Sequence, residues 1–191
     1  MEDLLLAAID DEDNREIYSE FIDIVMNQAA PALLASVSVL NNLTYLSDYY
    51  ELDYADVQLM AGQLAMQLRA LEARGCTLLF WQSADILVVD KQFYLIANLA
   101  QLVPLHKKNP EMLVLNYPPI SSLSGDSCAP ELLKIDALPF ITHCSASYYS
   151  LALLCLKKLN LSLDEIQGTK LFYFLERCLK ENANERHCFW I

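Results

Sequence analysis

Apolar residues recur at three- and four-residue spacing between residues 54 and 74, which predicts a long amphipathic helix with one buried stripe. Gly75 follows this segment, where a left-handed residue commonly ends a helix. The period then changes, because residues 85–89 and 93–96 are β-like and flank the polar turn 90–92. The sequence therefore predicts a long helix followed at once by a short β-hairpin.

The N-terminal third combines predicted helices with almost all of the net charge. Residues 2–9 and 15–27 are predicted to be helical. The second has an apolar stripe made of Ile17, Phe21, Ile24 and Val25. Residues 1–60 contain thirteen acidic residues and one basic residue, in a chain with a net charge of −12. Such a surface repels phosphate backbones and argues against direct nucleic-acid binding. It is either a solvated acidic face or a docking face for a partner with a basic surface.

The C-terminal half predicts further helices after a long loop. Residues 106–129 contain prolines, serines and Gly125, and we expect them to be loop-rich. Residues 148–158 and 169–180 are predicted to be buried helices. The expected fold class is thus mainly α with a short β-hairpin.

The six cysteines indicate a reducing environment. They are scattered through apolar stretches and form no C-x-x-C pair, which is typical of free buried thiols. We expect an intracellular protein of the cytoplasm or nucleus, with no membrane span, because no apolar run reaches the roughly 18 residues that a span needs. The last residues, Cys188-Phe189-Trp190-Ile191, match a prenylation box in form. Their two aromatic residues favour core packing instead.

Five segments resemble, in order and spacing, successive parts of the C-lobe of protein kinases. They are residues 68–75, 85–88, 127–133 with Ala129-Pro130-Glu131, 147–152, and 175–186. The resemblance covers residues 45–191. It implies a kinase C-lobe-like domain over 45–191 that lacks a normal N-lobe. Residues 1–44 would then be an acidic and apolar helical segment that packs on or caps this domain.

The same resemblance marks where catalytic residues are replaced. Counting from Gly75, the position of the catalytic aspartate falls on Phe80, which cannot orient a substrate hydroxyl. The metal-binding asparagine falls on Asp85, which could ligate a cation or cap a turn. The magnesium-binding aspartate falls near Ala97, which offers no side-chain oxygen. The first 45 residues contain no glycine and no lysine to bind the phosphates of ATP. We therefore expect no catalysis, no nucleotide or other cofactor, and no bound metal.

Structural positions of the family are retained. The resemblance implies a buried ion pair between Glu131 and Arg186, which are 55 residues apart in the chain. A family aspartate that supports the catalytic loop falls on Ser147. We expect this support to be lost together with the catalytic residue.

These observations favour a non-catalytic, pseudokinase-like binding or scaffold protein, a subunit of a larger protein assembly. Two alternatives stay open. One is an all-helical structural protein without kinase ancestry. The other is an enzyme of a different class. Hydrolysis would need a nucleophile–base pair such as Cys and His, but His143 and Cys144 adjoin in the chain, and such neighbours rarely form one.

Overall fold

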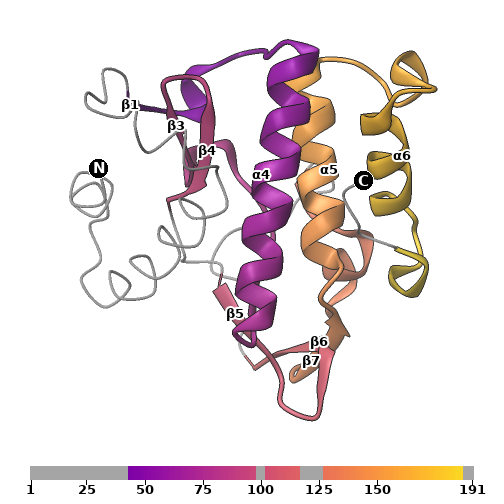
Figure 1. Ribbon diagram of the computed structural model, residues 1–191. Coiled ribbons are helices and arrows are strands. Elements are labelled where there is room, and N and C mark those ends of the chain that lie inside the picture. Colours follow the sequence, from indigo (N-terminus) through magenta and orange to yellow (C-terminus); the bar gives the residue numbers. More distant parts are fainter. Residues whose placement is uncertain (1–42, 98–101, 117–126, 187–191) are drawn as a thin grey trace.

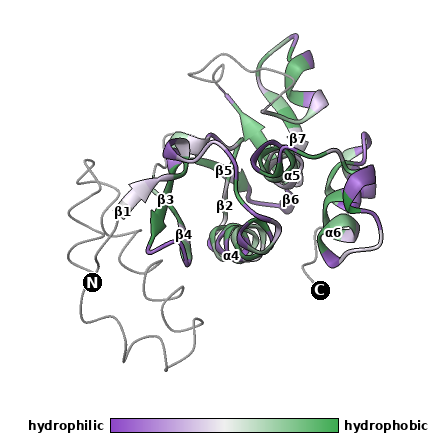
Figure 2. Ribbon diagram, turned by 90° about the horizontal axis from the view of Figure 1, so that it is seen from above, coloured by the Kyte–Doolittle hydropathy of each residue, from purple (hydrophilic) through white to green (hydrophobic). Residues whose placement is uncertain are grey.

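The described helices of the computed structural model stand side by side, and two small sheets flank them (Figure 1). The structure describes residues 43–97, 102–116 and 127–186. The helices are α4 (Tyr54–Ala73), α5 (Ala146–Leu159) and α6 (Lys170–Cys178). The strands are β1 (Leu43–Tyr45), β2 (Cys76–Leu78), β3 (Ile86–Val89), β4 (Phe93–Ile96), β5 (Leu102–His106), β6 (Asn109–Leu115) and β7 (Phe140–His143). Viewed from above, α4 and α5 form the centre of the described part of the molecule and α6 lies beyond α5 (Figure 2).

The prediction of a mainly α fold with a single hairpin is wrong. The strands form two antiparallel sheets, one of three strands in the order β1-β3-β4 and one of four in the order β2-β5-β6-β7. The strands that the sequence did not predict are β1, β2, β5, β6 and β7. Of these, only β6 lies within the region predicted to be loop-rich, where it pairs with β5 and with β7. Pro110 did not prevent this, because pairing with β7 begins only at Met112.

The local predictions from residue 54 to residue 96 are confirmed. Asp53 caps α4 by accepting a hydrogen bond of 2.8 Å from the N–H of Asp56. Gly75 adopts φ +84° just after the helix, as expected for a left-handed cap. The hairpin of β3 and β4 turns through Asp90 and Lys91, both at positive φ.

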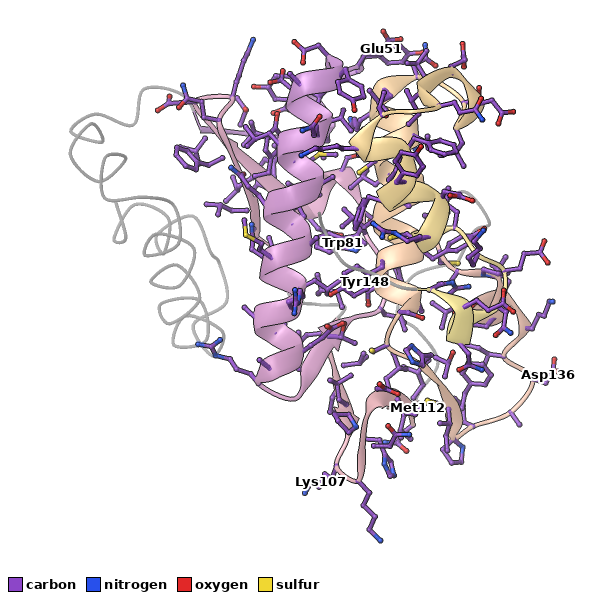
Figure 3. All side chains as sticks on the ribbon, turned by 45° about the vertical axis from the view of Figure 1, so that its right-hand side comes forward. Glu51, Trp81, Lys107, Met112, Asp136 and Tyr148 are labelled. Atoms are coloured by element: carbon purple, nitrogen blue, oxygen red, sulfur yellow. The ribbon has the colours of Figure 1, made fainter. Side chains whose placement is uncertain are left out.

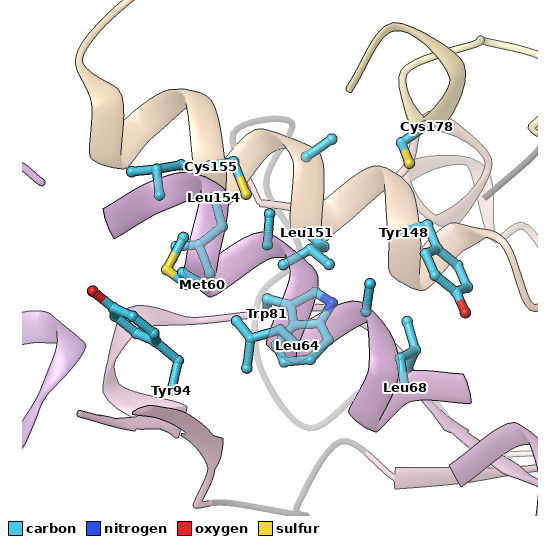
Figure 4. Close-up of a cluster of buried hydrophobic side chains, with 14 of the residues drawn as sticks. Met60, Leu64, Leu68, Trp81, Tyr94, Tyr148, Leu151, Leu154, Cys155 and Cys178 are labelled. Carbon is cyan, nitrogen blue, oxygen red and sulfur yellow. The ribbon is translucent and has the colours of Figure 1, made fainter. Parts of the chain in front are cut away.

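Two apolar clusters form the core. The larger one joins α4, α5 and α6 to one face of the three-stranded sheet (Figure 4). The predicted stripe of α4 lies in it, since Val57, Met60, Ala61, Leu64, Leu68 and Leu71 are all buried. The smaller cluster lies between β5, β6 and the start of α5 and includes Leu105, Leu113 and Leu132.

Two glutamines of α4 bind the outer edge of β4. Gln67 donates to the carbonyl of Tyr94 at 2.6 Å and accepts from the N–H of Ile96 at 3.0 Å. Gln63 accepts from the N–H of Tyr94 at 2.7 Å. Because the backbone groups of an edge strand would otherwise lack partners, these amides attach the sheet to the helix.

Candidate functional site

The segment that contains Phe80 is packed into the core. Phe80 and Leu79 are each 2% exposed and belong to the smaller cluster, whereas Leu78 and Trp81 belong to the larger one. Residues 78–81 therefore connect the two clusters. At the position where the resemblance expects a catalytic group, the side chain is an aromatic ring closed off from solvent.

Ser147 supports this segment, so the expected loss of support is wrong. Its hydroxyl donates to the carbonyl of Leu78 and lies 3.0 Å from the hydroxyl of Thr77. Ser147 is completely buried at the start of α5. The serine side chain is short, but α5 lies close enough to β2 for its hydroxyl to reach the Leu78 carbonyl.

A second serine and a backbone carbonyl of α5 bind Trp81. The N–H of Trp81 donates to the hydroxyl of Ser150 at 2.8 Å, and its indole Nε1 donates to the carbonyl of Ser147 at 2.8 Å. The Ser150 hydroxyl in turn donates to the carbonyl of Ser127. Figure 3 shows Trp81 and Tyr148 in the middle of the molecule beside the helices. Burial of residues 78–81 is therefore accompanied by hydrogen bonds to the Leu78 carbonyl and from both N–H groups of Trp81.

The structure brings Asp85 and Ala97 together through the backbone. Asp85 ends a short 3₁₀ turn before β3 and is half-buried, and its carbonyl accepts from the N–H of Ala97 at 2.8 Å. This bond closes the base of the hairpin. In the described ranges, no three histidine, cysteine or acidic side chains gather closely enough to hold a metal ion.

Glu131 and Arg186 form a two-pronged pair. Arg186 Nη1 donates to Glu131 Oε1 at 2.5 Å, and Nη2 donates to Oε2 at 2.9 Å. The side chain of Arg186 is fully buried, and that of Glu131 is 20% exposed. The parallel arrangement of two charge-assisted bonds is the strongest geometry for such a pair.

Arg186 makes further contacts that hold the end of the described chain against the domain. Its Nε donates to the carbonyl of Lys180 at 2.7 Å, and Nη2 donates to that of Glu181 at 3.0 Å. The guanidinium also lies 4.7 Å from the ring centre of Tyr149 in α5. One side chain thus links the segment of Glu131, the helix α5 and the turn after α6.

His143 and Cys144 are engaged in separate contacts. Nδ1 of His143 accepts from the N–H of Ser145 at 3.1 Å, and burial lowers the pKa of this imidazole. Cys144 is half-buried, and its N–H donates to the carbonyl of Glu111 at 2.8 Å. Both residues therefore help to fix the connection between β7 and α5.

Glu72 is the most strongly enclosed carboxylate near this connection. Its Oε2 accepts from the hydroxyl of Tyr148 at 3.1 Å, and its Oε1 is buried without a hydrogen-bond partner. Desolvation raises the pKa of Glu72, although hydrogen bonds from Tyr148 and Cys144 oppose the shift. The sequence does not indicate this environment, because Glu72 lies in the last turn of α4 and a glutamate is ordinarily exposed.

Lys158 is a buried cation that the sequence did not single out. Its Nζ donates to the carbonyl of Leu46 at 2.9 Å and to that of Tyr49. Desolvation lowers the pKa of this ammonium, and the neighbouring Lys157 adds to the effect. Lys158 also lines a pocket of about 370 Å³ at the C-terminal end of α5, together with Tyr50, Glu51 and Ser83. Its bonds tie the segment before α4 to α5.

The structure describes four of the acidic residues within the first sixty. Three of them accept hydrogen bonds from nearby groups, and the fourth, Asp56, lies beside one of these three. Asp48 accepts from the N–H of Tyr45 at 3.0 Å, and Glu51 accepts from the side chain of Asn160 at 2.6 Å. Asp53 caps α4 next to Asp56. The other nine acids lie outside the described residues, so the predicted single acidic face stays a prediction.

None of the described cysteines forms a disulfide bond. Cys128, Cys155 and Cys178 are buried, and Cys76 and Cys144 are partly exposed. Burial raises the pKa of the Cys76 and Cys155 thiols, which keeps them protonated. Cys188, and with it the C-terminal tetrapeptide, lies outside the described residues.

No family model matches this chain, and no curated protein matches its sequence. No helix that the structure describes has the length and apolar character to cross a membrane.

Proposed function

We propose that this chain is a non-catalytic, pseudokinase-like binding protein that serves as a scaffold or subunit of a larger assembly. The observation that carries the proposal is the burial of Phe80. A catalytic aspartate must reach the substrate hydroxyl to accept or orient its proton. The Phe80 ring is 2% exposed among the apolar side chains of the smaller cluster, so neither the chemistry nor the access that phosphoryl transfer needs is provided there.

The contacts around this segment support a role as a rigid platform. Hydrogen bonds made by Ser147, Ser150 and Trp81 hold residues 78–81 in place, and none of them requires a ligand. Catalytic groups without a ligand are costly to hold in place, whereas packed apolar groups stabilise the fold. The pair of Glu131 and Arg186 supports the same view, because it is a structural feature that the resemblance implies and that needs no nucleotide.

The proposed partner is a protein with a basic surface that faces the acidic residues 1–60. Thirteen of the 25 acidic residues lie in this third of the chain, against one of the thirteen basic residues. Complementary charge steers association and discriminates against partners of the wrong sign. The free thiols favour a reducing compartment, the cytoplasm or the nucleus.

A native affinity capture with the full chain tests this function. The charge-neutralising variant Asp10→Asn/Asp13→Asn should lose a large part of the captured partner, and raising the salt concentration should weaken capture by the wild type. The matched control, Glu111→Gln/Asp136→Asn, removes two acids outside residues 1–60, both of which are exposed, and should retain the partner. Capture that is insensitive to salt and equal for all three proteins would contradict the acidic docking face.

A further inference from the structure

The central strand β3 of the sheet β1-β3-β4 is apolar and closed to solvent on both faces. Side chains alternate between the two faces along a strand, yet all four residues of β3 are buried. The inner face packs on the side of α4, since Ile86, Val88 and Tyr94 belong to the larger cluster with the buried stripe of that helix. The outer face must be buried by something else.

The outer face is a continuous apolar surface across the three strands. Strand pairing places Tyr45 beside Leu87 and Leu87 beside Leu95, and it places Val89 beside Phe93. Leu87, Val89 and Leu95 are 3%, 2% and 7% exposed. None of these three belongs to either apolar cluster of the described residues. An apolar face closed in this way requires a cover that is itself apolar.

We propose that residues 15–27 of the same chain pack on this outer face through Ile17, Phe21, Ile24 and Val25. These four side chains fall on one stripe of the predicted helix, and a helix stripe on a sheet face is the usual solution for two half-apolar elements. Glu16, Glu20 and Asp23 lie off this stripe. They would stay in solvent when the stripe is buried.

The chain length outside the described residues fits this occupant. The described chain begins with β1 at Leu43, which is an edge strand of the sheet in question. Fifteen residues, 28–42, connect the predicted helix to β1 and can span up to ~50 Å when extended. Three strands are only about 10 Å wide. The helix can therefore lie back over its own sheet, and the inference does not depend on the kinase resemblance.

Hydrogen exchange on full-length variants tests the inference. Phe21→Asp places a charge in the stripe and should raise amide exchange at Leu87 and Leu95 at least about tenfold. Exchange in α5 should stay unchanged, which shows that the domain is still folded. Ser19→Asp introduces the same charge on the opposite side of the predicted helix and should leave β3 and β4 as in the wild type. Equal exchange in both variants, with α5 protected, would overturn the proposal.

A photo-crosslinking amino acid at position 93 distinguishes the possible occupants. Phe93 is half-exposed on the outer face, so the substitution is tolerable there. We expect an intramolecular crosslink to a peptide within residues 15–27. As a control, the same amino acid placed at Tyr173, which is exposed on α6, should form no crosslink to this peptide. A crosslinked dimer, or products that lie entirely outside residues 15–27, would show that another surface covers the sheet and would refute the proposal.

Discussion

At the scale of single residues, Arg186 is the side chain with the most consequential set of contacts. It donates to both oxygens of Glu131 and to two backbone carbonyls, and it is fully buried. Arg186→Ala should lower the free energy of unfolding by about 3 kcal/mol, near the lower end for a broken buried pair. The lower end applies because Glu131 keeps 20% exposure and can be partly hydrated. Chemical denaturation of the purified variant measures the loss.

An exposed pair in the same region provides the control. Lys180 and Glu176 are 3.2 Å apart, and both side chains are more than 40% exposed. Lys180→Ala should change stability by about 0–1 kcal/mol. If Arg186→Ala and Lys180→Ala lose equal stability, the buried pair does not stabilise the fold more than an exposed pair, contrary to what its geometry indicates.

Ser147 should be more important for stability than its size suggests. Ser147→Ala removes the hydroxyl that binds the Leu78 carbonyl and leaves that buried acceptor without this partner. We expect a loss of about 1–3 kcal/mol. Ser47→Ala, at an exposed position, should stay within about 0.5 kcal/mol. Equal stability of both variants in thermal or chemical unfolding would show that the backbone contact contributes nothing.

Glu72 should make stability depend on pH with a sign opposite to that of most carboxylates. Folding raises its pKa above the ordinary value of 4.5, so its contribution to stability is complete below 4.5 and is lost as the pH rises through the raised pKa. Glu72→Gln should therefore be more stable than the wild type at neutral pH. This advantage should shrink as the pH falls towards 4.5, which a pH series of unfolding curves can follow.

Glu165 provides a control of opposite sign. Hydrogen bonds from Ser162 lower the pKa of this exposed carboxylate. Its favourable contribution is present above the ordinary value of 4.5 and disappears as the pH falls through the lowered pKa. Glu165→Gln should thus lose stability at neutral pH and approach the wild type in acid. An identical pH response of the two variants would contradict the assigned environments.

At the scale of elements, Gln67 is one of two glutamines that join α4 to β4, and it binds the strand at two points. Gln67→Leu would leave the Tyr94 carbonyl and the Ile96 N–H without this partner. We expect a loss of about 2 kcal/mol and faster amide exchange at Ile96. Gln58→Leu, on the same helix but only partly buried, should leave that amide protected. Unchanged exchange at Ile96 in Gln67→Leu would mean that the edge is held by other contacts.

The elements also differ in how far the sequence could predict them. The helix α4 and the β3–β4 hairpin were predictable because their apolar periods and end residues agree with each other. Strand β6 was not, because it begins with Asn109-Pro110-Glu111 and its apolar half is recognisable only once β5 and β7 lie beside it. Strand β7 is short, and Ile141 in it is exposed, so it shows no alternation of its own.

In the candidate site, too, some features could be predicted from the sequence and others could not. The burial of residues 78–81 followed from their composition. The pairing of Glu131 with Arg186 could only be inferred from the resemblance, because nothing local joins residues 55 apart. The role of the Ser147 hydroxyl was missed, since it depends on how closely α5 approaches β2. Contacts that depend on such tertiary distances leave no periodic signal in the sequence.

At the scale of the whole molecule, residues 78–81 join two apolar clusters, and three polar contacts from α5 complete their burial. A nucleotide site at this place would require the clusters to separate. The proposed function is therefore that of a stable binding platform without a site for ATP and magnesium.

The most direct test is the melting temperature of the full-length chain with and without millimolar ATP and Mg²⁺. A ligand that binds the folded state must raise the melting temperature, because it stabilises that state by RT ln(1 + [L]/Kd). The proposed function predicts an unchanged melting temperature under both conditions. A reproducible increase of a few degrees that requires both ATP and Mg²⁺ would contradict it.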